Sequence, residues 1–318
     1  MKTANRKLIG ITAIVVVAVC IAVVLVIFSK GSNTKRLPAE TDGFTEEVTT
    51  VDRVLYADEM AAVADASVGD IVYFGSYEQD NDADNGTEPV KWYVLDKADG
   101  EAVLLAVDLL DCQKYHEADE DITWENCTLR SWLNGEFYNT VFSEEEQAAI
   151  VNTNVANEDN SYWGWDTEGG NDTTDKVWLL SLGEIERYFH IDMNVYHDDS
   201  SIGHMNWYEY FIHWYGHMNW YEYALYCYGQ DNRLCAKPTA YAIARGVGRY
   251  SEANVQSSLI KDGYDTSYAV GCGWWWLRSP GKYNCTVSLV GRDGLVFGSG
   301  HGPSADSHGV RPALKVVF

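Results

Sequence analysis

The hydrophobic positions divide the chain into one long apolar run, a polar connection and a large region of short periodic segments. Residues 8–28 carry no charge and are long enough to cross a bilayer as a helix. Because a cleavable signal peptide has a shorter apolar core and a small-residue cleavage site, which is missing before Ser29, we predict a retained transmembrane signal anchor. We expect residues 1–7 to form a cytoplasmic tail and the rest of this single-pass protein to lie on the extracytoplasmic side of the cell membrane.

The polar connection lacks apolar periodicity and is rich in small and charged residues. We interpret residues 29–67 as a juxtamembrane stalk, in which residues 58–66 are compatible with a short helix. The folded domain is expected at residues 68–318.

Short apolar runs in this domain predict strands, and capping signals predict a few short helices. The predicted strands fall at residues 70–77, 90–96, 101–110, 175–181, 274–279, 285–290, 295–297 and 313–318. The tetrapeptide KADG predicts a hairpin between the second and third of these strands. The predicted helices are a run at residues 123–138 with a stop at Gly135, two segments with capping boxes at Ser143/Glu146 and Ser181/Glu184, and a segment at residues 237–246. Scattered short strands with few helices predict an α+β domain.

An internal repeat interrupts this pattern at about residues 196–229. The sequence GHMNWYEY begins at Gly203 and again at Gly216, an odd shift that exchanges the faces of a strand. We interpret the segment as an aromatic insertion that arose by tandem duplication. Its rings could stack on sugars, but packing against the parent domain is favoured because exposed apolar patches of this size are uncommon.

Charge narrows the classes of partner. The chain has 47 acidic and 23 basic residues and a net charge of −24, and residues 1–30 hold basic residues but no acid. The remaining chain therefore repels the phosphates of nucleic acid and of anionic lipids. We exclude nucleic acid as a partner and expect membrane contact only through the N-terminal helix.

Motifs for catalysis or metal binding are weak, since no GxSxG, CxxC or HExxH sequence occurs. Asp80, Asp82 and Asp84 alternate as in an EF-hand loop, but the glycine comes one residue late and the closing glutamate is missing, so a polar hairpin loop is predicted. His213 and His217 lack a third ligand at fixed spacing. We predict no metal and no cofactor.

Six cysteines lie outside the predicted anchor, at Cys112, Cys127, Cys227, Cys235, Cys272 and Cys285. An even count in an exported chain allows up to three disulfides, and their pairing is not readable from the sequence. Buried thiols are an equally good interpretation because a domain of this size can build a core without disulfides.

The most specific stretches of the chain are GWWWLRSPG at residues 273–281 and GVRPAL at residues 309–314. With upstream segments such as GDIVYFGSYEQDND and PVKWYVLD, they resemble a bacterial family of exported domains of unknown function catalogued as DUF6273. The resemblance covers most of residues 68–318. It implies a C-type-lectin-like fold, in the formylglycine-generating-enzyme-like variant with small antiparallel sheets, and makes Arg311 and Pro312 scaffold beside the final strand.

The resemblance also makes the tryptophan strand part of the core. Alternation puts Trp274, Trp276 and Arg278 on one face of this strand and Trp275 and Leu277 on the other. We expect at least one face to be buried and the arginine to be paired with a carboxylate.

Between the two specific stretches, the resemblance places a ligand surface. Alternation points Cys285, Val287 and Leu289 inward and their neighbours outward, GRDG makes a turn, and GSGHGPSADSHG forms a polar surface loop. The predicted ligand-binding residues are Tyr283, Asn284, Thr286, Ser288, Arg292, Asp293, Phe297, His301, Asp306 and His308.

We therefore expect a membrane-anchored extracytoplasmic domain that binds an extracellular glycan or protein. Two alternatives stay open. An oxidase of the formylglycine-generating type would need a thiol pair or a metal cluster, and Cys272 and Cys285 do not match the closely spaced pair of those enzymes. A structural envelope protein without a discrete ligand would have a flat, polar C-terminal surface.

Overall fold

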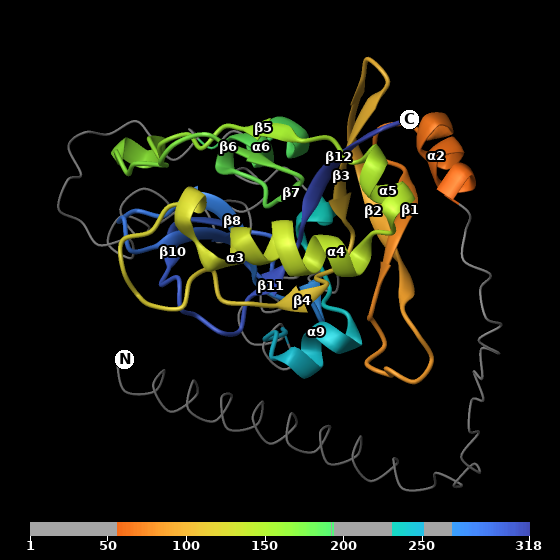
Figure 1. Cartoon of the computed structure of the whole chain (residues 1–318). Coiled ribbons are helices and arrows are strands. Elements are labelled where there is room, and N and C mark those ends of the chain that lie inside the picture. Colours follow the sequence, from red (N-terminus) through yellow and green to blue (C-terminus); the bar gives the residue numbers. More distant parts are fainter. Residues whose placement is uncertain (1–55, 192, 194–230, 251–268) are drawn as a thin grey trace, which may run out of the picture. The chain divides into compact units, whose positions relative to one another are not determined.

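The computed structural model describes residues 56–191, 193, 231–250 and 269–318 (Figure 1). The expected anchor at residues 8–28 and the repeat at about 196–229 lie outside these ranges, as does most of the expected stalk. Within the described ranges, no helix has the length and apolar character needed to span a bilayer. The elements below all belong to the unit Arg53–Phe318.

Short helices and short strands alternate along the described chain. The α-helices are α2 (Tyr56–Asp65), α3 (Thr128–Trp132), α4 (Tyr138–Val141), α5 (Glu144–Ala149), α6 (Leu182–Phe189) and α9 (Ala240–Arg245). Single turns are formed by η1 (Trp124–Asn126), η2 (Leu133–Phe137), η3 (Tyr162–Gly164) and η6 (Asn232–Leu234). The strands are β1 (Ile71–Tyr77), β2 (Glu88–Ala98), β3 (Glu101–Ala106), β4 (Asp111–Cys112), β5 (Thr153–Val155), β6 (Thr173–Asp175), β7 (Val177–Trp178), β8 (Trp275–Pro280), β9 (Val287–Val290), β10 (Val296–His301), β11 (Gly309–Val310) and β12 (Ala313–Val317). The expected α+β class is confirmed.

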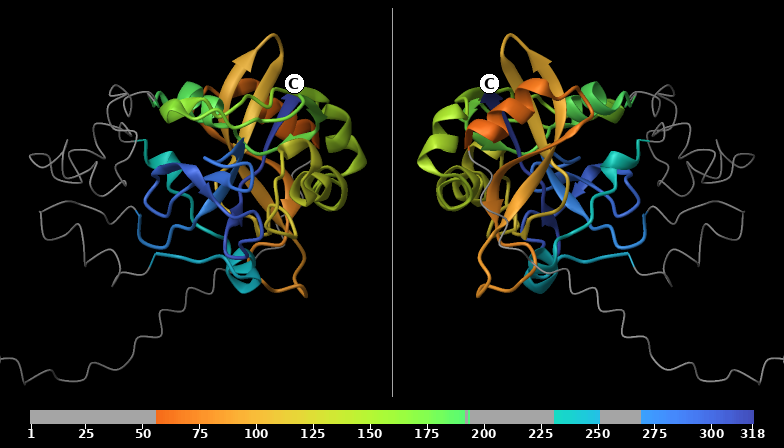
Figure 2. Two further views of the ribbon diagram at one scale, coloured as in Figure 1. Left: turned by 90° about the vertical axis from the view of Figure 1, so that its left-hand side faces the viewer. Right: turned by 90° about the vertical axis from the view of Figure 1, so that its right-hand side faces the viewer.

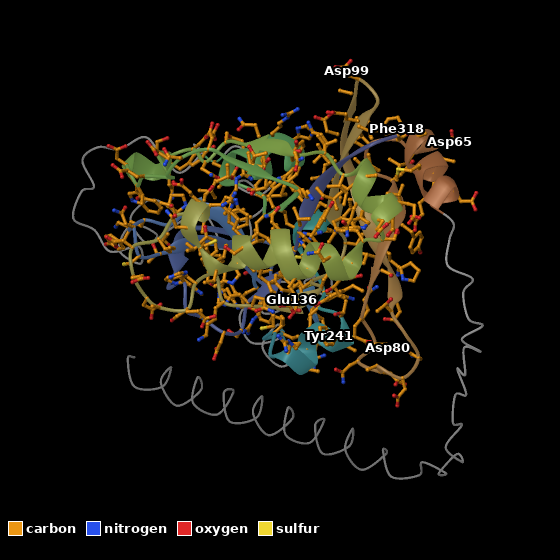
Figure 3. All side chains as sticks on the ribbon, viewed as in Figure 1. Asp65, Asp80, Asp99, Glu136, Tyr241 and Phe318 are labelled. Carbon is orange, nitrogen blue, oxygen red and sulfur yellow. The ribbon has the colours of Figure 1, made fainter. Side chains whose placement is uncertain are left out.

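The first sheet has the strand order β1-β2-β3-β12-β7, and all neighbouring strands in it are antiparallel. The predicted hairpin joins β2 to β3. Ala98 pairs with Glu101 there, and Asp99 and Gly100 both have positive φ, at 54° and 80°, as a type I′ turn requires. The hairpin projects beyond the rest of the sheet (Figure 2), with Asp99 at its tip (Figure 3).

The second sheet has the strand order β10-β9-β8-β11-β4. Strands β8, β9 and β10 form an antiparallel meander, while β11 pairs in parallel with β8 and antiparallel with β4. Only Arg311 and Pro312 separate β11, a strand of the second sheet, from β12, a strand of the first. The chain therefore passes directly from one sheet to the other at these two residues. In Figure 1, β8 and β10 lie on one side of β12, and β1 and β2 lie on the other.

Arg311 is fully buried where the chain passes from one sheet to the other. Its guanidinium donates hydrogen bonds to the carbonyl oxygens of Ala106 (2.8 Å), Arg233 (2.7 Å) and Val107 (3.3 Å). It also lies 4.9 Å from the centroid of the Trp275 ring. Burial lowers the pKa of Arg311 to about 10, so the side chain keeps its charge at neutral pH. The residue is scaffold, as expected.

The tryptophan strand is also core. Every residue of β8 is buried, Trp275 and Trp276 completely, whereas Trp274 just before the strand is half-buried. Arg278 of this strand forms an ion pair with Glu184 of α6. The burial of the strand and the carboxylate partner of its arginine are both confirmed.

Both predicted capping boxes are present. Ser143 and Glu146 cap α5, and Ser181 and Glu184 cap α6, with each serine hydroxyl accepting from the glutamate N–H and each glutamate carboxylate accepting from the serine N–H. Because Glu184 also pairs with Arg278, the cap of α6 ties this helix to the second sheet.

The predicted helix stop at Gly135 is wrong. Helical backbone continues from α3 through η2, a single π turn, into α4 and ends at Phe142, which has extended φ and ψ. Phe137 and Tyr138, just beyond the glycine, are both buried, and the Phe137 ring lies 5.4 Å from the ring of Tyr77 on β1. Burial of these two rings therefore outweighs the tendency of a glycine to end a helix.

Arg311→Met should lower the free energy of unfolding by about 3 kcal/mol or more, because it leaves one buried and two partly buried carbonyl oxygens without their donors. The measurement is denaturant unfolding followed by tryptophan fluorescence. The matched control is Lys315→Met, since Lys315 pairs with Glu101 at 3.1 Å in a partly exposed position, and its loss should cost less than about 1 kcal/mol. Equal losses would contradict the role given to the buried guanidinium.

Candidate functional site

Aromatic and basic side chains gather around the half-buried ring of Trp274. The centroid of this ring lies 5.0 Å from that of Phe297, 5.2 Å from that of His301 and 6.1 Å from that of His308. The Arg292 guanidinium lies 5.7 Å from the same ring and 6.0 Å from the ring of Tyr250. The Trp274 cluster is defined as Tyr250, Trp274, Arg292, Phe297, His301 and His308.

The second sheet positions this cluster. The carbonyl oxygen of Trp274 accepts a hydrogen bond from Gly309 N at 2.7 Å, which holds the ring beside the start of β11. On β10, the pairing with β9 shifts between Phe297 and His301. Gly300 lies at this shift with φ +77°, and a Cβ there would come within 2.5 Å of the Val287 carbonyl oxygen. Glycine is therefore required at position 300. The irregularity determines the position of His301, the last residue of β10.

His301 and His308 form a hydrogen-bonded pair, with Nδ1 of His301 2.9 Å from Nε2 of His308. The His308 ring also stacks on Trp276, with the ring centroids 4.3 Å apart and the planes 15° from parallel. Burial, followed by the neighbouring His301 and Arg292, lowers the pKa of His308 to about 3, and desolvation lowers the pKa of His301. At neutral pH the pair is neutral, with one imidazole donating and the other accepting.

Arg292 supplies the positive charge of the cluster. Within the described ranges, no carboxylate lies within 4.0 Å of its guanidinium, and its Nε is buried without a hydrogen-bond partner. A Cβ at Gly248 would come within 2.9 Å of Nη2, so the glycine makes room for the side chain. The adjacent Asp293 uses its Oδ1 to accept from Leu295 N at 3.2 Å, and burial raises the pKa of this carboxyl. A half-buried arginine over two aromatic rings is suited to an anionic or hydroxyl-rich ligand.

The structure thus brings together four of the predicted ligand-binding residues, Arg292, Phe297, His301 and His308, with Asp293 beside them. Tyr283 and Asn284 are exposed in the β8–β9 turn, and among the described residues no ring contact joins Tyr283 to the cluster. Thr286 organises that turn through hydrogen bonds with the backbone N–H and carbonyl of Tyr283. Asp306 is exposed, and its backbone carbonyl accepts from the Cys112 thiol.

Two predicted orientations are wrong. Ser288 is fully buried and donates to the carbonyl of Pro280 at 2.7 Å, whereas Cys285 is exposed. The reason is that β9 is an interior strand covered on both faces, and its pairing with β8 shifts between Trp276 and Pro280, which breaks the simple alternation. His308 was expected in a surface loop, but it is 4% exposed because it stacks on Trp276.

Sequence reasoning missed Trp274 as the centre of the cluster and missed Tyr250. Alternation grouped Trp274 with the buried Trp276, although Trp274 precedes the strand and keeps part of its ring exposed. Phe297 and His301 share the spacing of one strand face, which was the available signal for their proximity.

A second aromatic group lies near the β8–β9 turn. The Lys282 ammonium is 5.7 Å from the Trp165 ring centroid and 5.5 Å from that of Tyr283, and Tyr283 is 60% exposed. The backbone N–H of Lys282 donates to the carbonyl of Ser299 on β10 at 3.0 Å, so this group adjoins the strand that carries Phe297.

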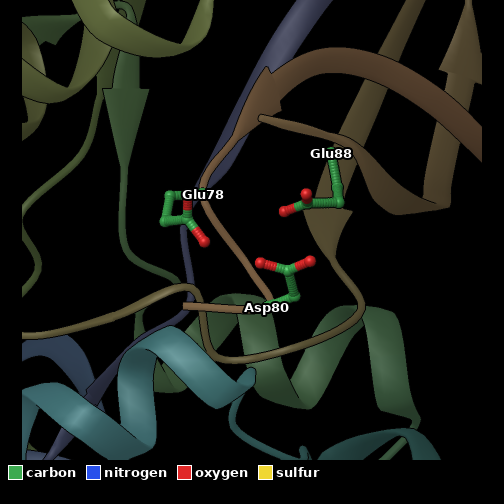
Figure 4. Close-up of side chains that lie close together, drawn as sticks. All are labelled: Glu78, Asp80 and Glu88. Carbon is green, nitrogen blue, oxygen red and sulfur yellow. The ribbon is translucent and has the colours of Figure 1, made fainter. Parts of the chain in front are cut away.

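Three acidic side chains, Glu78, Asp80 and Glu88, converge where β1 leads into β2, with carboxylate oxygens within 4.8 Å of one another (Figure 4). Glu78 Oε1 accepts from the backbone N–H groups of Asn81 and Asp82. Hydrogen bonds, first of all from Asn85, lower the pKa of Asp80. These acids order the loop that the sequence predicted as a polar hairpin.

The sequence model of the family described as "Domain of unknown function (DUF6273)" matches residues 99–317. The match includes both specific stretches and every member of the Trp274 cluster. Comparison with curated proteins finds no match, and comparison with solved structures finds none.

Replacement of His308 should change the pH dependence of stability. The pKa of His308 is lowered from 6.5 to about 3 in the folded chain. Between these two pH values the imidazole is protonated in the unfolded chain but not in the folded chain. The free energy of unfolding therefore falls as the pH falls from 6.5 toward 3. Between pH 7 and pH 5, the wild type should lose about 2 kcal/mol more than His308→Phe, which keeps an aromatic ring on Trp276. Denaturant unfolding at a series of pH values measures this difference, and parallel profiles would refute it.

Proposed function

The chain belongs to the family described as a domain of unknown function (DUF6273), and we propose that it is a membrane-anchored extracytoplasmic domain that binds an acidic glycan at the Trp274 cluster. The observation that carries the proposal is an arginine without an ion-pair partner in the described chain, held over a half-buried tryptophan ring.

Aromatic rings and polar groups have complementary roles in such a site. The apolar face of a sugar ring packs on an aromatic side chain, here Trp274 or Phe297, and its hydroxyl groups need donors and acceptors at the rim. The neutral His301–His308 pair leaves Nε2 of the exposed His301 imidazole for a ligand, and this nitrogen accepts when Nδ1 donates to His308 and donates when Nδ1 accepts.

Arg292 determines the class of glycan. The domain as a whole is strongly acidic and repels polyanions such as nucleic acid, but the aromatic rings around this guanidinium favour a cation without neutralising it, so the charge of Arg292 acts locally. A sugar carboxylate fits a guanidinium with two parallel hydrogen bonds. We therefore propose that the ligand carries an acidic sugar, which a purely hydroxyl-based site would not select.

The second aromatic group extends the proposed surface. Tyr283 and Trp165 flank the Lys282 ammonium, and Lys282 is hydrogen-bonded to β10. A ligand of several sugar units could contact both groups, which supports an oligosaccharide rather than a single sugar. This part of the proposal keeps Tyr283 and Asn284 in the ligand surface.

The finer fold assignment and the location are parts of the same proposal. Two small sheets, a three-strand meander near the C-terminal end and short peripheral helices support a C-type-lectin-like fold. The resemblance described under Sequence analysis implies a ligand surface in the region between the two specific stretches, in agreement with this assignment. The apolar run at residues 8–28 supports an anchored, outward-facing domain.

Binding of the full chain to an array of neutral and acidic oligosaccharides tests the proposal. We expect selective binding to acidic members, and Arg292→Gln should weaken it at least about tenfold, because one charge-assisted contact is lost. The matched control is Arg187→Gln, since Arg187 is exposed on α6 and pairs with Asp96. The affinity of this variant for acidic oligosaccharides should equal that of the wild type.

The other outcomes each contradict part of the proposal. Equal binding to neutral and acidic glycans would remove the argument from Arg292. Binding that survives Arg292→Gln would move the site to another surface. No binding to any glycan would favour a protein ligand or a structural envelope role.

A further inference from the structure

We propose that Cys235 and Cys272 are a redox-active pair that forms a disulfide by exchange with a small-molecule disulfide. This modification site is independent of ligand binding at the Trp274 cluster. It assigns one pair among the six cysteines whose pairing the sequence leaves open.

The backbone brings the two cysteines side by side. Gly273 N, next to one cysteine, donates to the carbonyl of Ala236, next to the other, at 3.0 Å. On the other side of Cys235, the carbonyl of Leu234 accepts from Trp275 Nε1 at 3.1 Å. These contacts fix the two segments against each other, and the cysteine side chains are hydrogen-bonded to one another. Adjacent chain segments that bring two thiols into hydrogen-bond contact place the sulfurs close enough for us to propose a disulfide between them.

The surroundings of the pair favour exchange. The hydrogen bond from Cys235 lowers the pKa of Cys272, and Lys237 and Arg311 act in the same direction. Cys272 is buried, whereas Cys235 is half-buried and can be reached by a small reagent. The same hydrogen bond raises the pKa of Cys235, so the thiolate of the pair rests on Cys272, and the accessible Cys235 sulfur becomes nucleophilic only when the shared proton moves to Cys272.

The exchange balances in two steps. Transfer of the shared proton puts the thiolate on Cys235, which attacks one sulfur of the small disulfide and releases one small thiolate. The first small thiolate takes the proton of Cys272, which then attacks the Cys235 sulfur of the mixed disulfide, breaks that S–S bond and expels the second small thiolate, which is protonated by water. The two protein thiols are oxidised, and the small disulfide is reduced to two thiols.

The remaining described cysteines lack these features. Burial raises the pKa of Cys112 to about 11 and that of Cys127 to about 12, and within the described ranges neither has a neighbouring cysteine to share its proton. Cys285 is exposed, and no interaction with another cysteine is seen for it within the described ranges. Cys227 lies outside those ranges.

Oxidation of the pair bears on the neighbouring turn. A Cβ at Gly294 would come within 2.9 Å of the Cys235 sulfur, so the turn that carries Arg292 rests directly on this thiol. A disulfide would fix the sulfur beneath that turn and would tie η6 to the segment just before β8.

The test is to incubate the full chain with oxidised glutathione, alkylate the remaining thiols and map the peptides by mass spectrometry. We expect a linked peptide that joins Cys235 to Cys272, with Cys285 glutathionylated as the internal sign that the reagent is active. In Cys272→Ser, the mixed disulfide should accumulate at Cys235 because nothing resolves it. Cys127→Ser is the matched control and should still form the link.

Thermal unfolding gives a second readout that needs no variant. The oxidised wild type should melt roughly 5 °C or more above the reduced protein, because the bond constrains the unfolded chain between residues 235 and 272. The proposal is overturned if both cysteines stay open to alkylation while Cys285 is glutathionylated, or if the link joins another pair. Because the peptide map of the wild type decides this alone, a variant that fails to fold does not obscure the result.

Discussion

The buried guanidinium of Arg311 is the interaction on which the two-sheet arrangement depends. A charge removed from water is costly unless every donor finds an acceptor. Here the acceptors come from the end of β3, from the residue after it and from η6, while the Trp275 ring of β8 covers one face of the cation. One side chain therefore fixes parts of both sheets and a distant loop relative to one another. No local pattern requires this, since the acceptors are backbone carbonyls that any sequence could supply.

The Trp274 cluster is built on the frame that this interaction holds. Trp275 faces the guanidinium of Arg311, and the residue before it, Trp274, turns toward the rings of Phe297 and His301. The paired cysteines lie between these two regions, since Cys235 follows η6 and Cys272 precedes the tryptophans. Scaffold and candidate ligand surface are thus a few residues apart on one strand. A change in the core beneath β8 would reach the surface through rigid packing rather than through a flexible loop.

The sequence predicted those parts of the fold that local chemistry determines. The KADG hairpin, both capping boxes and the burial of Trp275 and Trp276 follow from turn geometry, hydrogen-bonding pairs and apolar runs, all of which act over a few residues. The predictions for Gly135, Ser288 and His308 were wrong because distant contacts decided them. Rings pack beyond the glycine, the serine lies on an interior strand that is covered on both faces, and the histidine stacks on Trp276. The contact of Cys235 with Cys272 was unreadable for the same reason.

The place of β12 has a consequence for biosynthesis. This strand lies between β3 and β7, so the first sheet stays divided until residues 313–317 have left the ribosome. Almost the whole domain must be synthesised before its core can close, because the contacts that β12 makes with β3 join segments far apart in the chain. Until the last strand is available, the edges of the divided sheet lack a partner strand, and a nascent chain of this kind would need protection from aggregation.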